Sequence, residues 1–391
     1  MSKAIPYSKQ KITKEDIKAV VDVLKSEYLT TGPMIKKFEQ DVCKFVNSKY
    51  SVSTNSATSA LHIACKAIGL KPGDYLWTSP NSFVASSNCA LYCGAKVDFV
   101  DIELSNYNID INLLEKKLIL AKKKRCLPKI IIPVMYAGHP HNLKELYKLS
   151  KKFNFKIIED ASHALGAEYF GKPIGNCMYS DICVFRFHPV KIITTGEGGI
   201  ATTNNKNYCD KMNLFKSHGI TRDKKNFIFL NREITYYEQH ELGFNYRLTD
   251  IQSALGISQL KKIKKFLTAR LKIKNFYDKE LKKFPFILPK QNKNVKSTWH
   301  LYPVLINTDL TNKKKYQLLN FMRKNKIYVN SHYIPIHLQP YYKNLGFKKK
   351  DFINSVNFYE NEISLPIFPG LKKSELKYII QIIDKFFKKK F

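Results

Sequence analysis

Hydrophobic and polar positions divide the chain into regions of different period. Between about residues 50 and 205, short runs rich in β-branched and aromatic residues alternate with longer segments of helical pattern. Six runs predict strands, at residues 50–54, 75–78, 96–100, 130–134, 156–159 and 182–185. The alternation predicts a mostly parallel sheet between helices. A ligand crevice is expected beyond the carboxyl ends of its strands.

The C-terminal part carries helical patterns. Thr249–Gln252 is a capping-box sequence, which predicts the start of a long helix that ends near Leu281 and bridges to a second domain. Another helix is expected at about 312–326. The last helix has an apolar stripe on one face, made of Leu376, Ile379, Ile380, Ile383 and Phe387. This stripe could lie on a membrane, but packing onto its own domain fits the pattern better.

The length and composition fit a globular protein. A chain of 391 residues, 44% of them hydrophobic, is long enough for two domains with their own cores. No apolar run reaches the roughly 18 residues of a membrane span. The first ten residues contain no apolar signal core. We therefore expect a cytoplasmic protein that does not associate with a membrane.

The cysteines and the charge exclude several classes of function. Eight cysteines are scattered without a CxxC pair or a Cys/His metal spacing, so reduced core cysteines and no metal site are expected. The formal net charge is +34. Its lysine clusters are dispersed and lack any nucleic-acid-binding signature, so no specific nucleic acid is expected as a partner. Steering of an anionic small substrate is a milder consequence of the same charge.

Lys191 is the strongest candidate for chemistry. It is a lone lysine in the apolar, Gly/Thr-rich stretch 185–199, whereas most other lysines are clustered. An ammonium among apolar neighbours loses hydration, so its pKa falls and the free amine can attack a carbonyl. The alternative is a lysine that extends from a strand end and keeps its ammonium in water.

Two further elements are predicted at strand ends. Asn55–Leu61 lies where a strand gives way to a helix, so its amides and hydroxyls could bind phosphate, or Ser and Thr there could simply cap the helix. Asp160 ends a buried strand, where its carboxylate could keep a heterocyclic nitrogen protonated or could cap the next turn. His163 could donate to a neighbouring oxygen. A phosphate site, a carboxylate and a desolvated amine are the groups that pyridoxal phosphate requires.

At these residues the chain resembles the DegT/DnrJ/EryC1/StrS family of sugar aminotransferases, which depend on pyridoxal phosphate. The resemblance covers essentially the whole chain, and its strongest segments are 29–33, 55–61, 159–166, 187–199, 217–219 and 243–252. It implies an α/β protein of aminotransferase fold type I, with a mostly parallel seven-stranded sheet between helices and a smaller α+β C-terminal domain. The implied division is an N-terminal segment 1–14, a large domain 15–265 and a small domain 266–391.

The resemblance also implies a role for each cofactor residue. Lys191 would bind the aldehyde of pyridoxal phosphate and Asp160 the ring nitrogen, and the cofactor would pass through its pyridoxamine phosphate form. His163 would lie near the 3′ oxygen and Phe83 would stack on the ring. Thr58 and Ser59 would hold the phosphate together with Asn245 of a second subunit, so the resemblance implies a homodimer.

Arg186 departs from the family pattern, which usually has a serine at this position that contacts the phosphate. A guanidinium could replace that contact with a charge-assisted hydrogen bond, or it could point away. The sequence leaves both possibilities open.

Within the family, the substrate-end segments 5–7, 298–303, 332–342 and 364–366 are most similar to enzymes that aminate carbon 4 of a UDP-linked 4-keto-6-deoxy-N-acetylhexosamine in pseudaminic acid biosynthesis. Glutamate would be the amino donor. The candidate substrate-binding residues are Tyr7, Thr31, His332, Tyr333 and His337.

Three alternatives were weighed. The first is an aminotransferase for another nucleotide-linked 3- or 4-keto sugar. The second is a sugar 3-dehydratase, in which a histidine replaces the lysine, and the presence of Lys191 argues against it. The third is a catalytically inactive basic binding protein on the same fold, for which a missing lysine or aspartate would be expected.

Overall fold

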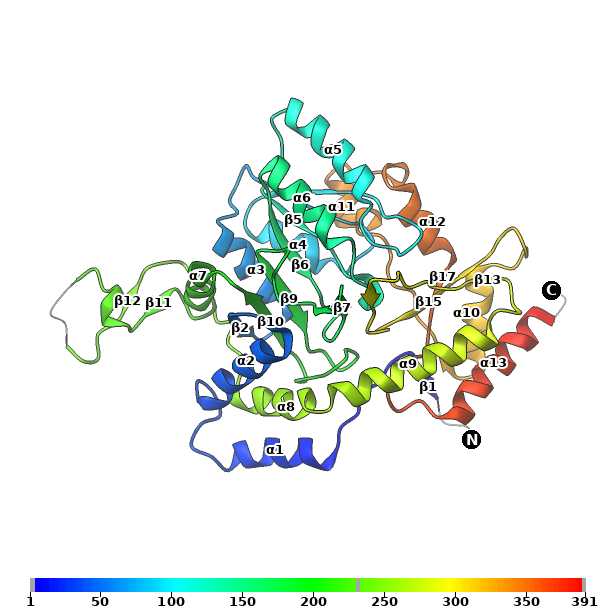
Figure 1. The fold of residues 1–391 in the computed structure, drawn as a ribbon, viewed down its shortest axis with the longest axis horizontal. Coiled ribbons are helices and arrows are strands. Elements are labelled where there is room, and N and C mark those ends of the chain that lie inside the picture. The colour runs from blue at the N-terminus through cyan, green and yellow to red at the C-terminus, as the bar shows by residue number, and fades with distance from the viewer. Residues whose placement is uncertain (1–3, 230–232, 389–391) are drawn as a thin grey trace.

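The computed structural model describes residues 4–229 and 233–388, and its centre is a seven-stranded sheet (Figure 1). In spatial order the strands are β2 (Tyr50–Thr54), β10 (Gly199–Thr203), β9 (Ile182–Arg186), β6 (Lys156–Asp160), β5 (Ile130–Ile132), β3 (Tyr75–Thr78) and β4 (Lys96–Phe99). β10 runs antiparallel to both its neighbours, and all other neighbours are parallel. The predicted mostly parallel sheet is confirmed.

Of the seven strands, β10 is the one that the hydrophobic pattern missed. Its five residues are all buried. Gly199 at one end and Thr202 and Thr203 at the other weaken the apolar pattern of the sequence. Gly199 begins the strand beside the start of α3 (Ala57–Ile68), where a Cβ atom would lie 2.5 Å from the amide nitrogen of Ala57. Glycine therefore allows the strand and the helix N-terminus to approach closely.

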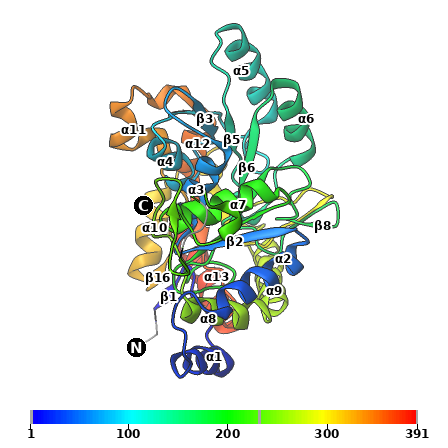
Figure 2. The same ribbon diagram turned by 90° about the vertical axis from the view of Figure 1, so that its left-hand side faces the viewer.

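Helices cover both faces of the sheet (Figure 2). Side chains alternate along each strand, so Ile130 and Ile132 face one layer while Ile131 faces the other. The first layer contains α3, α4 (Ala85–Tyr92) and α7 (Lys206–Lys216). The second contains α2 (Pro33–Val46), α5 (Ile111–Lys123), α6 (Leu143–Phe153) and α8 (Asp250–Leu260). The first layer carries the helix that begins at the predicted phosphate site.

A smaller antiparallel sheet forms the C-terminal part. Its strands are β13 (Phe286–Ile287), β15 (Tyr302–Ile306) and β17 (Glu362–Leu365). Its core also includes residues of α9 (Ile263–Glu280), α10 (Lys315–Lys324) and α13 (Lys373–Lys388). The apolar stripe of α13 is buried in this core, which confirms packing onto its own domain. Phe386 is more buried than the predicted Phe387 at the edge of the stripe.

The predicted long helix from Thr249 is two helices, which corrects the sequence-based expectation. The capping box at Thr249 is present and begins α8. The break lies at Lys261 and Lys262, where the Lys262 amide donates to the Gln259 carbonyl three residues back. The Lys262 ammonium is bound by Asp16 and Thr13. A turn with i to i+3 bonds therefore separates α8 from α9.

The N-terminal segment belongs in space to the small sheet's side of the molecule. β1 (Ile5–Pro6) pairs in parallel with β16 (Ile327–Tyr328), and Ile5 is part of the small domain's core. The next helix, α1 (Lys14–Leu24), packs instead on α8. The segment thus spans both halves, and the domain boundaries at residues 14 and 265 stay predictions.

The remaining elements lie at the periphery. They are β7 (Glu168–Tyr169), β8 (Lys172–Pro173), β14 (Val295–Lys296), β11 (Ile220–Thr221), β12 (Glu238–Gln239), α11 (Pro340–Asn344), α12 (Ile353–Asn361), η1 (Tyr136–Gly138), η2 (Lys224–Asn226), η3 (Ile336–Leu338) and η4 (Lys349–Asp351). The β11–β12 pair extends away from the body of the molecule (Figure 1).

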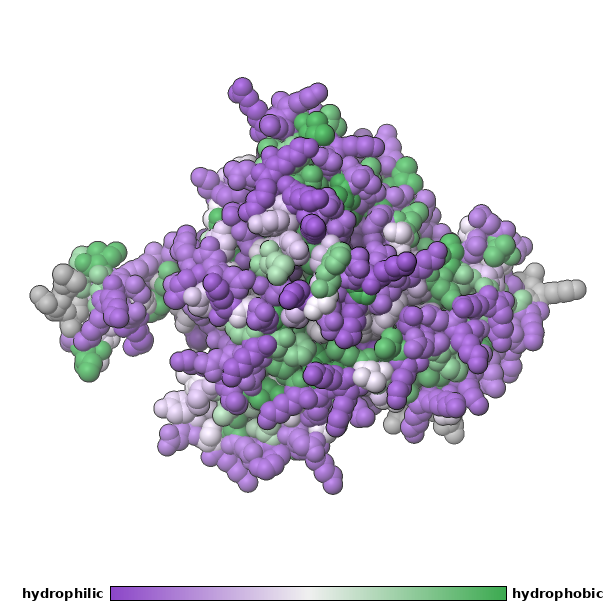
Figure 3. Space-filling view, in the orientation of Figure 1, coloured by the Kyte–Doolittle hydropathy of each residue, from purple (hydrophilic) through white to green (hydrophobic). Residues whose placement is uncertain are grey.

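Hydrophilic residues cover most of the face seen in Figure 3. None of the helices in the described ranges combines the length and the apolar character needed to cross a membrane.

Asp250 is a buried carboxylate that ties α8 to the start of α2. It accepts hydrogen bonds from the amides of Gly32 (2.7 Å) and Met34 (2.8 Å). In Asp250→Ala both buried amides lose a charged acceptor, so we expect a loss of about 3 kcal/mol in the free energy of unfolding. Denaturant unfolding of the native chain and of the variant at the same protein concentration measures this difference in the free energy of unfolding. The exposed pair of Asp22 with Lys18 is the control, because Asp22→Ala should change stability by less than about 0.5 kcal/mol.

Candidate active site

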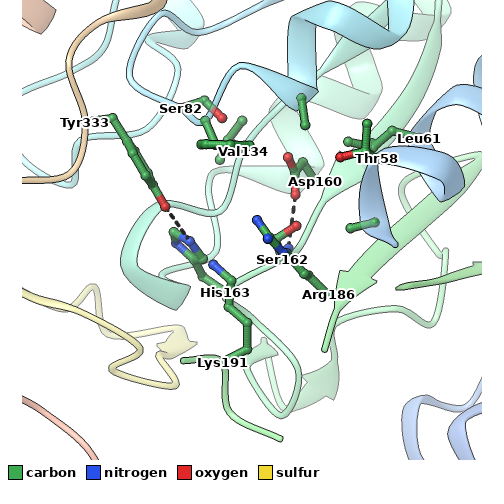
Figure 4. Close-up of a pocket in the computed structure, with 13 residues that line it drawn as sticks. Thr58, Leu61, Ser82, Val134, Asp160, Ser162, His163, Arg186, Lys191 and Tyr333 are labelled. Atoms are coloured by element: carbon green, nitrogen blue, oxygen red, sulfur yellow. Dashed lines mark hydrogen bonds between the residues drawn. The ribbon is translucent and has the colours of Figure 1, made fainter. Parts of the chain in front are cut away.

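A pocket lies at the carboxyl ends of β6 and β9, where α3 begins (Figure 4). The space free of protein atoms within it, open solvent at its mouth included, is about 420 Å³. Its walls are Ala57, Thr58, Leu61, Ser82, Phe83, Ala85, Val134, Asp160, Ser162, His163, Arg186, Lys191 and Tyr333. The pocket therefore lies beyond the carboxyl ends of the strands, where the alternation of strands and helices predicted a ligand crevice.

Lys191 is buried in this pocket, with 8% of its surface exposed. Burial and, second, the Arg186 guanidinium lower its pKa to about 7, although Asp160 acts in the opposite direction. The alternative of a lysine with its ammonium in water does not fit this burial. An amine with a pKa near 7 is partly unprotonated at neutral pH, so it can act as a nucleophile.

Asp160 is held from two sides at the end of β6. The Ser86 hydroxyl donates to its Oδ2 at 2.6 Å, and the Ser162 amide donates to its Oδ1 at 3.1 Å. Ser86 in turn lies 2.8 Å from the Ser82 hydroxyl. The bond to Ser162 is a turn contact of the kind that the alternative reading expected. The carboxylate also lines the pocket, so it is placed to meet a ligand there, and its contact with a heterocyclic nitrogen stays a prediction.

His163 follows Asp160 and faces Lys191 across the pocket (Figure 4). Its Nε2 lies 3.0 Å from the Tyr333 hydroxyl, whereas its buried Nδ1 has no hydrogen-bond partner among the described residues. Burial and the nearby Lys191 lower its pKa far below the usual value. The ring is therefore neutral, with one nitrogen left for a bound molecule.

The start of α3 brings only one of the two predicted phosphate residues into the pocket. Ser56 caps the helix by accepting from the Ser59 amide. The Ser59 hydroxyl donates to Asn55 at 2.6 Å, so it is engaged in the cap and does not line the pocket. Thr58 lines it. Amides of the first helical turn have no intrahelical partner and favour an anion beside Thr58.

Arg186 contributes an unpaired cation to the same pocket. Its Cζ lies 5.7 Å from the centre of the Phe83 ring, and within the described residues its guanidinium has no hydrogen-bond or ion-pair partner. Phe83 is 48% exposed and faces Tyr333 at 6.3 Å between ring centres. An unpaired guanidinium in a partly buried site favours an anionic ligand.

Of the predicted substrate residues, Tyr333 is a wall of the pocket, and the other four are not. Tyr7 packs on the ring of His332, at 5.2 Å between centres, behind Tyr333. The His332 Nδ1 is bound to Ser364. His337 is fully buried against Phe352 in a separate apolar cluster, so it is not placed to contact a ligand of this pocket.

Two further predicted residues lie outside the pocket of this chain. Thr31 is exposed on the loop before α2, and its hydroxyl donates to its neighbour Thr30. Asn245 lies beside the start of α3, where its carbonyl accepts from the Asn55 side chain at 3.5 Å. Its predicted contact with a second subunit stays a prediction.

The sequence analysis missed His300. This histidine is 1% exposed, its Nε2 lies 3.4 Å from the Lys191 amine, and its ring lies 4.3 Å from that of His163. It belongs to the segment Thr298–Pro303 that carried the resemblance at the substrate end. The signal available in the sequence was a histidine within that segment. Its distance along the chain from Lys191 concealed the contact between the two side chains.

These groups fit pyridoxal phosphate. The helix N-terminus and Arg186 suit a phosphate, Asp160 suits a protonated ring nitrogen, the open Nδ1 of His163 suits a ring oxygen and Lys191 suits an aldehyde. No cluster of metal-ligating side chains is found in residues 4–229 and 233–388.

Comparisons with known proteins agree with this geometry. A UDP-4-amino-4,6-dideoxy-N-acetyl-beta-L-altrosamine transaminase of Campylobacter jejuni is 39% identical over 376 residues, which are 96% of this chain and 95% of that protein. Among solved structures, PseC of Helicobacter pylori is described as an aminotransferase involved in the biosynthesis of pseudoaminic acid. It superposes with a TM-score of 0.89 at 35% identity, over 99% of this chain and 100% of that one.

The third relative is a putative sugar aminotransferase, Spr1654 of Streptococcus pneumoniae, in its PLP form. It superposes with a TM-score of 0.86 at 29% identity, over 98% of this chain and 100% of that one. The expected aminotransferase fold type I is confirmed by these structures. A sequence profile of one family matches residues 10–384. The chain therefore belongs to the DegT/DnrJ/EryC1/StrS aminotransferase family.

Proposed function

We propose that this aminotransferase uses pyridoxal phosphate to move an amino group from glutamate to carbon 4 of a UDP-linked 4-keto-6-deoxy-N-acetylhexosamine, a step of pseudaminic acid biosynthesis. The observation that carries the proposal is the buried Lys191 amine in one pocket with Asp160, in a chain 39% identical to a transaminase named for such a sugar. The alternative acceptor is another nucleotide-linked 3- or 4-keto sugar.

Each cofactor contact in this proposal falls on a residue with a suitable group. Lys191 would hold the aldehyde carbon, Asp160 the ring nitrogen and His163 the 3′ oxygen, while Phe83 would cover the ring. Thr58 and the first amides of α3 would hold the phosphate, and Ser59 would support them through its bond to Asn55. When bound, pyridoxal phosphate stores the electrons of a substrate carbanion in its protonated ring.

Lys191 supplies the proton transfers. Because burial brings its pKa to about 7, its amine can both accept and return a proton at neutral pH. The amine would take a proton from the α carbon of glutamate in one half of the cycle and would deliver a proton to carbon 4 of the sugar in the other, and the bound cofactor would carry the amino group between the two halves. A lysine with its ordinary pKa of about 10.4 would be almost wholly protonated and a poor base.

The second half of the proposal is a homodimer in which Asn245 of a second subunit completes the phosphate site. Asn245 lies at the start of α3 without reaching its own pocket, which supports a contact in another copy. We also keep the cytoplasm as the compartment, because all eight cysteines are free and a reducing environment preserves thiols.

A panel of UDP- and dTDP-linked keto sugars, each incubated with the enzyme, pyridoxal phosphate and glutamate, tests the reaction. We expect amination at carbon 4 of the UDP-linked 4-keto-6-deoxy-N-acetylhexosamine, identified by mass spectrometry and NMR of the product. Faster amination of a dTDP-linked or a 3-keto sugar would replace this acceptor by the alternative. No amination of any sugar, by protein that binds the cofactor, would overturn the proposed activity.

Reduction with borohydride tests the role of Lys191. The native chain should carry a reduced pyridoxyl group on Lys191 in a peptide map, and Lys191→Ala should lose both the adduct and at least about 99.9% of turnover. The matched control is Lys315, a half-buried lysine, whose pKa burial lowers to about 8. Lys315→Met should keep the adduct on Lys191, and an adduct on Lys315 in the native chain would contradict the assignment.

Arg186→Ser tests whether the guanidinium holds the cofactor phosphate. Loss of a charge-assisted hydrogen bond should weaken pyridoxal phosphate binding by about tenfold or more. Binding is measured by absorbance titration of the cofactor-free protein with pyridoxal phosphate and with pyridoxal, which lacks the phosphate. Affinity for pyridoxal should change little. An equal loss for both compounds, or no loss for either, would show that Arg186 points away from the phosphate.

A further inference from the structure

His300 and Lys191 meet across the junction of the two sheets. Lys191 follows β9 of the large sheet, whereas His300 precedes β15 of the small one. Their Nζ and Nε2 atoms lie 3.4 Å apart. Within the described residues this is the one hydrogen-bond contact of the Lys191 amine, which has no carboxylate within ion-pair distance. His300 is thus the nearest polar partner of the proposed nucleophile.

The segment that carries His300 is clamped from both sides. On the large-domain side, the His300 amide donates to the Ala137 carbonyl at 3.0 Å, and the Thr298 hydroxyl donates to the His163 carbonyl at 2.6 Å. Gly138 makes this approach possible, since a Cβ atom there would lie 1.8 Å from the Thr298 hydroxyl. The backbone before β15 therefore cannot move without breaking contacts to the pocket wall.

Arg270 of α9 holds the same segment from the small-domain side. Its Nη1 lies near the carbonyls of Trp299 (3.3 Å), His300 (3.0 Å) and Ile367 (2.9 Å). Arg270 is fully buried and has no carboxylate partner in the described chain, and its hydrogen bonds run from Nη1 to backbone carbonyls, while its Nε has no partner among the described residues. These hydrogen bonds from a buried arginine fix the position of the backbone that carries His300.

The imidazole is neutral because of its surroundings. Burial, the neighbouring His163 and the cation of Lys191 all lower the pKa of His300 far below its usual value. The other ionisable groups near Lys191 and His300 are Asp160 of β6, Arg186 of β9, Glu197 of the following loop, Arg270 of α9 and His332 after β16. A neutral imidazole can bind an ammonium without adding another charge to this set.

We propose that His300 is a positioning residue for Lys191. Its Nε2 accepts a hydrogen bond from the ammonium form of Lys191 and so holds the amine at the pocket. With its proton on Nε2 instead, the same ring can donate to the free amine. A hydrogen bond from a charged donor is roughly twice as strong as one between neutral groups. The contact therefore favours the ammonium overall and partly offsets the desolvation of Lys191.

The test compares His300→Leu, which removes the acceptor, with His300→Gln, which keeps an acceptor at similar reach. The pKa of Lys191 is measured in the full-length cofactor-free protein from the pH dependence of acetylation by acetic anhydride, read by peptide mass spectrometry. In His300→Leu the acid dissociation constant of Lys191 should rise about tenfold, that is, its pKa should fall by about one unit. His300→Gln should restore most of the difference.

His141→Leu is the matched control, because His141 is also a buried histidine and lies outside the pocket. It should leave the pKa of Lys191 unchanged. Thermal unfolding of each variant identifies any that do not fold, and His300→Met, which also lacks an acceptor of this strength, replaces His300→Leu if that variant does not fold. An unchanged Lys191 pKa in folded His300→Leu, or no recovery in His300→Gln, would overturn the proposal.

This inference rests on the proposed role of Lys191, but the experiment separates the two. The acetylation measurement needs neither cofactor nor sugar, so it reports the contact between two side chains even if the enzyme acts on another substrate. Conversely, a missing borohydride adduct on Lys191 would refute the proposed function and leave the measured coupling to His300 intact.

Discussion

The structure keeps one amine out of water, and the proposed chemistry depends on this burial. Lys191 is enclosed by the ends of β6 and β9 on one side and by Tyr333 and the segment before β15 on the other. Neither sheet alone would bury it. The low proton affinity of the amine is therefore a product of how the two halves of the chain meet, and any loosening of that junction would return the lysine to ordinary behaviour.

The polar groups around the lysine divide their tasks without pairing with it directly. Asp160 is fixed by Ser86 of α4 and by the Ser162 amide, so its charge is stabilised from two sides. Arg186, on the neighbouring strand β9, has no ion-pair partner among the described residues. Because these opposite charges are not joined to each other, both stay available to a ligand. The pocket is in this sense organised for an anionic aromatic molecule before one arrives.

Much of this could be predicted from the sequence, and the failures have physical causes. Six strands were found because each is a short apolar run, whereas β10 was missed because Thr202 and Thr203 disguise a buried strand. Lys191 could be recognised as a site candidate because its chain neighbours are apolar, and Asp160 because it ends a predicted buried strand. His300 did not, since its importance comes from a contact with a residue 109 positions away. The break between α8 and α9 depends on the tertiary bond between Lys262 and Asp16, which no local pattern encodes.

The pairing of β1 with β16 has a consequence for the order in which the protein folds. Ile5 aligns with Ile327, so β1 cannot take its place until a segment far along the chain has folded beside it. Until then Ile5 and the core that it joins are open to solvent. Closure between such distant parts of a chain is entropically slow, so β1 is expected to join the small domain late in folding.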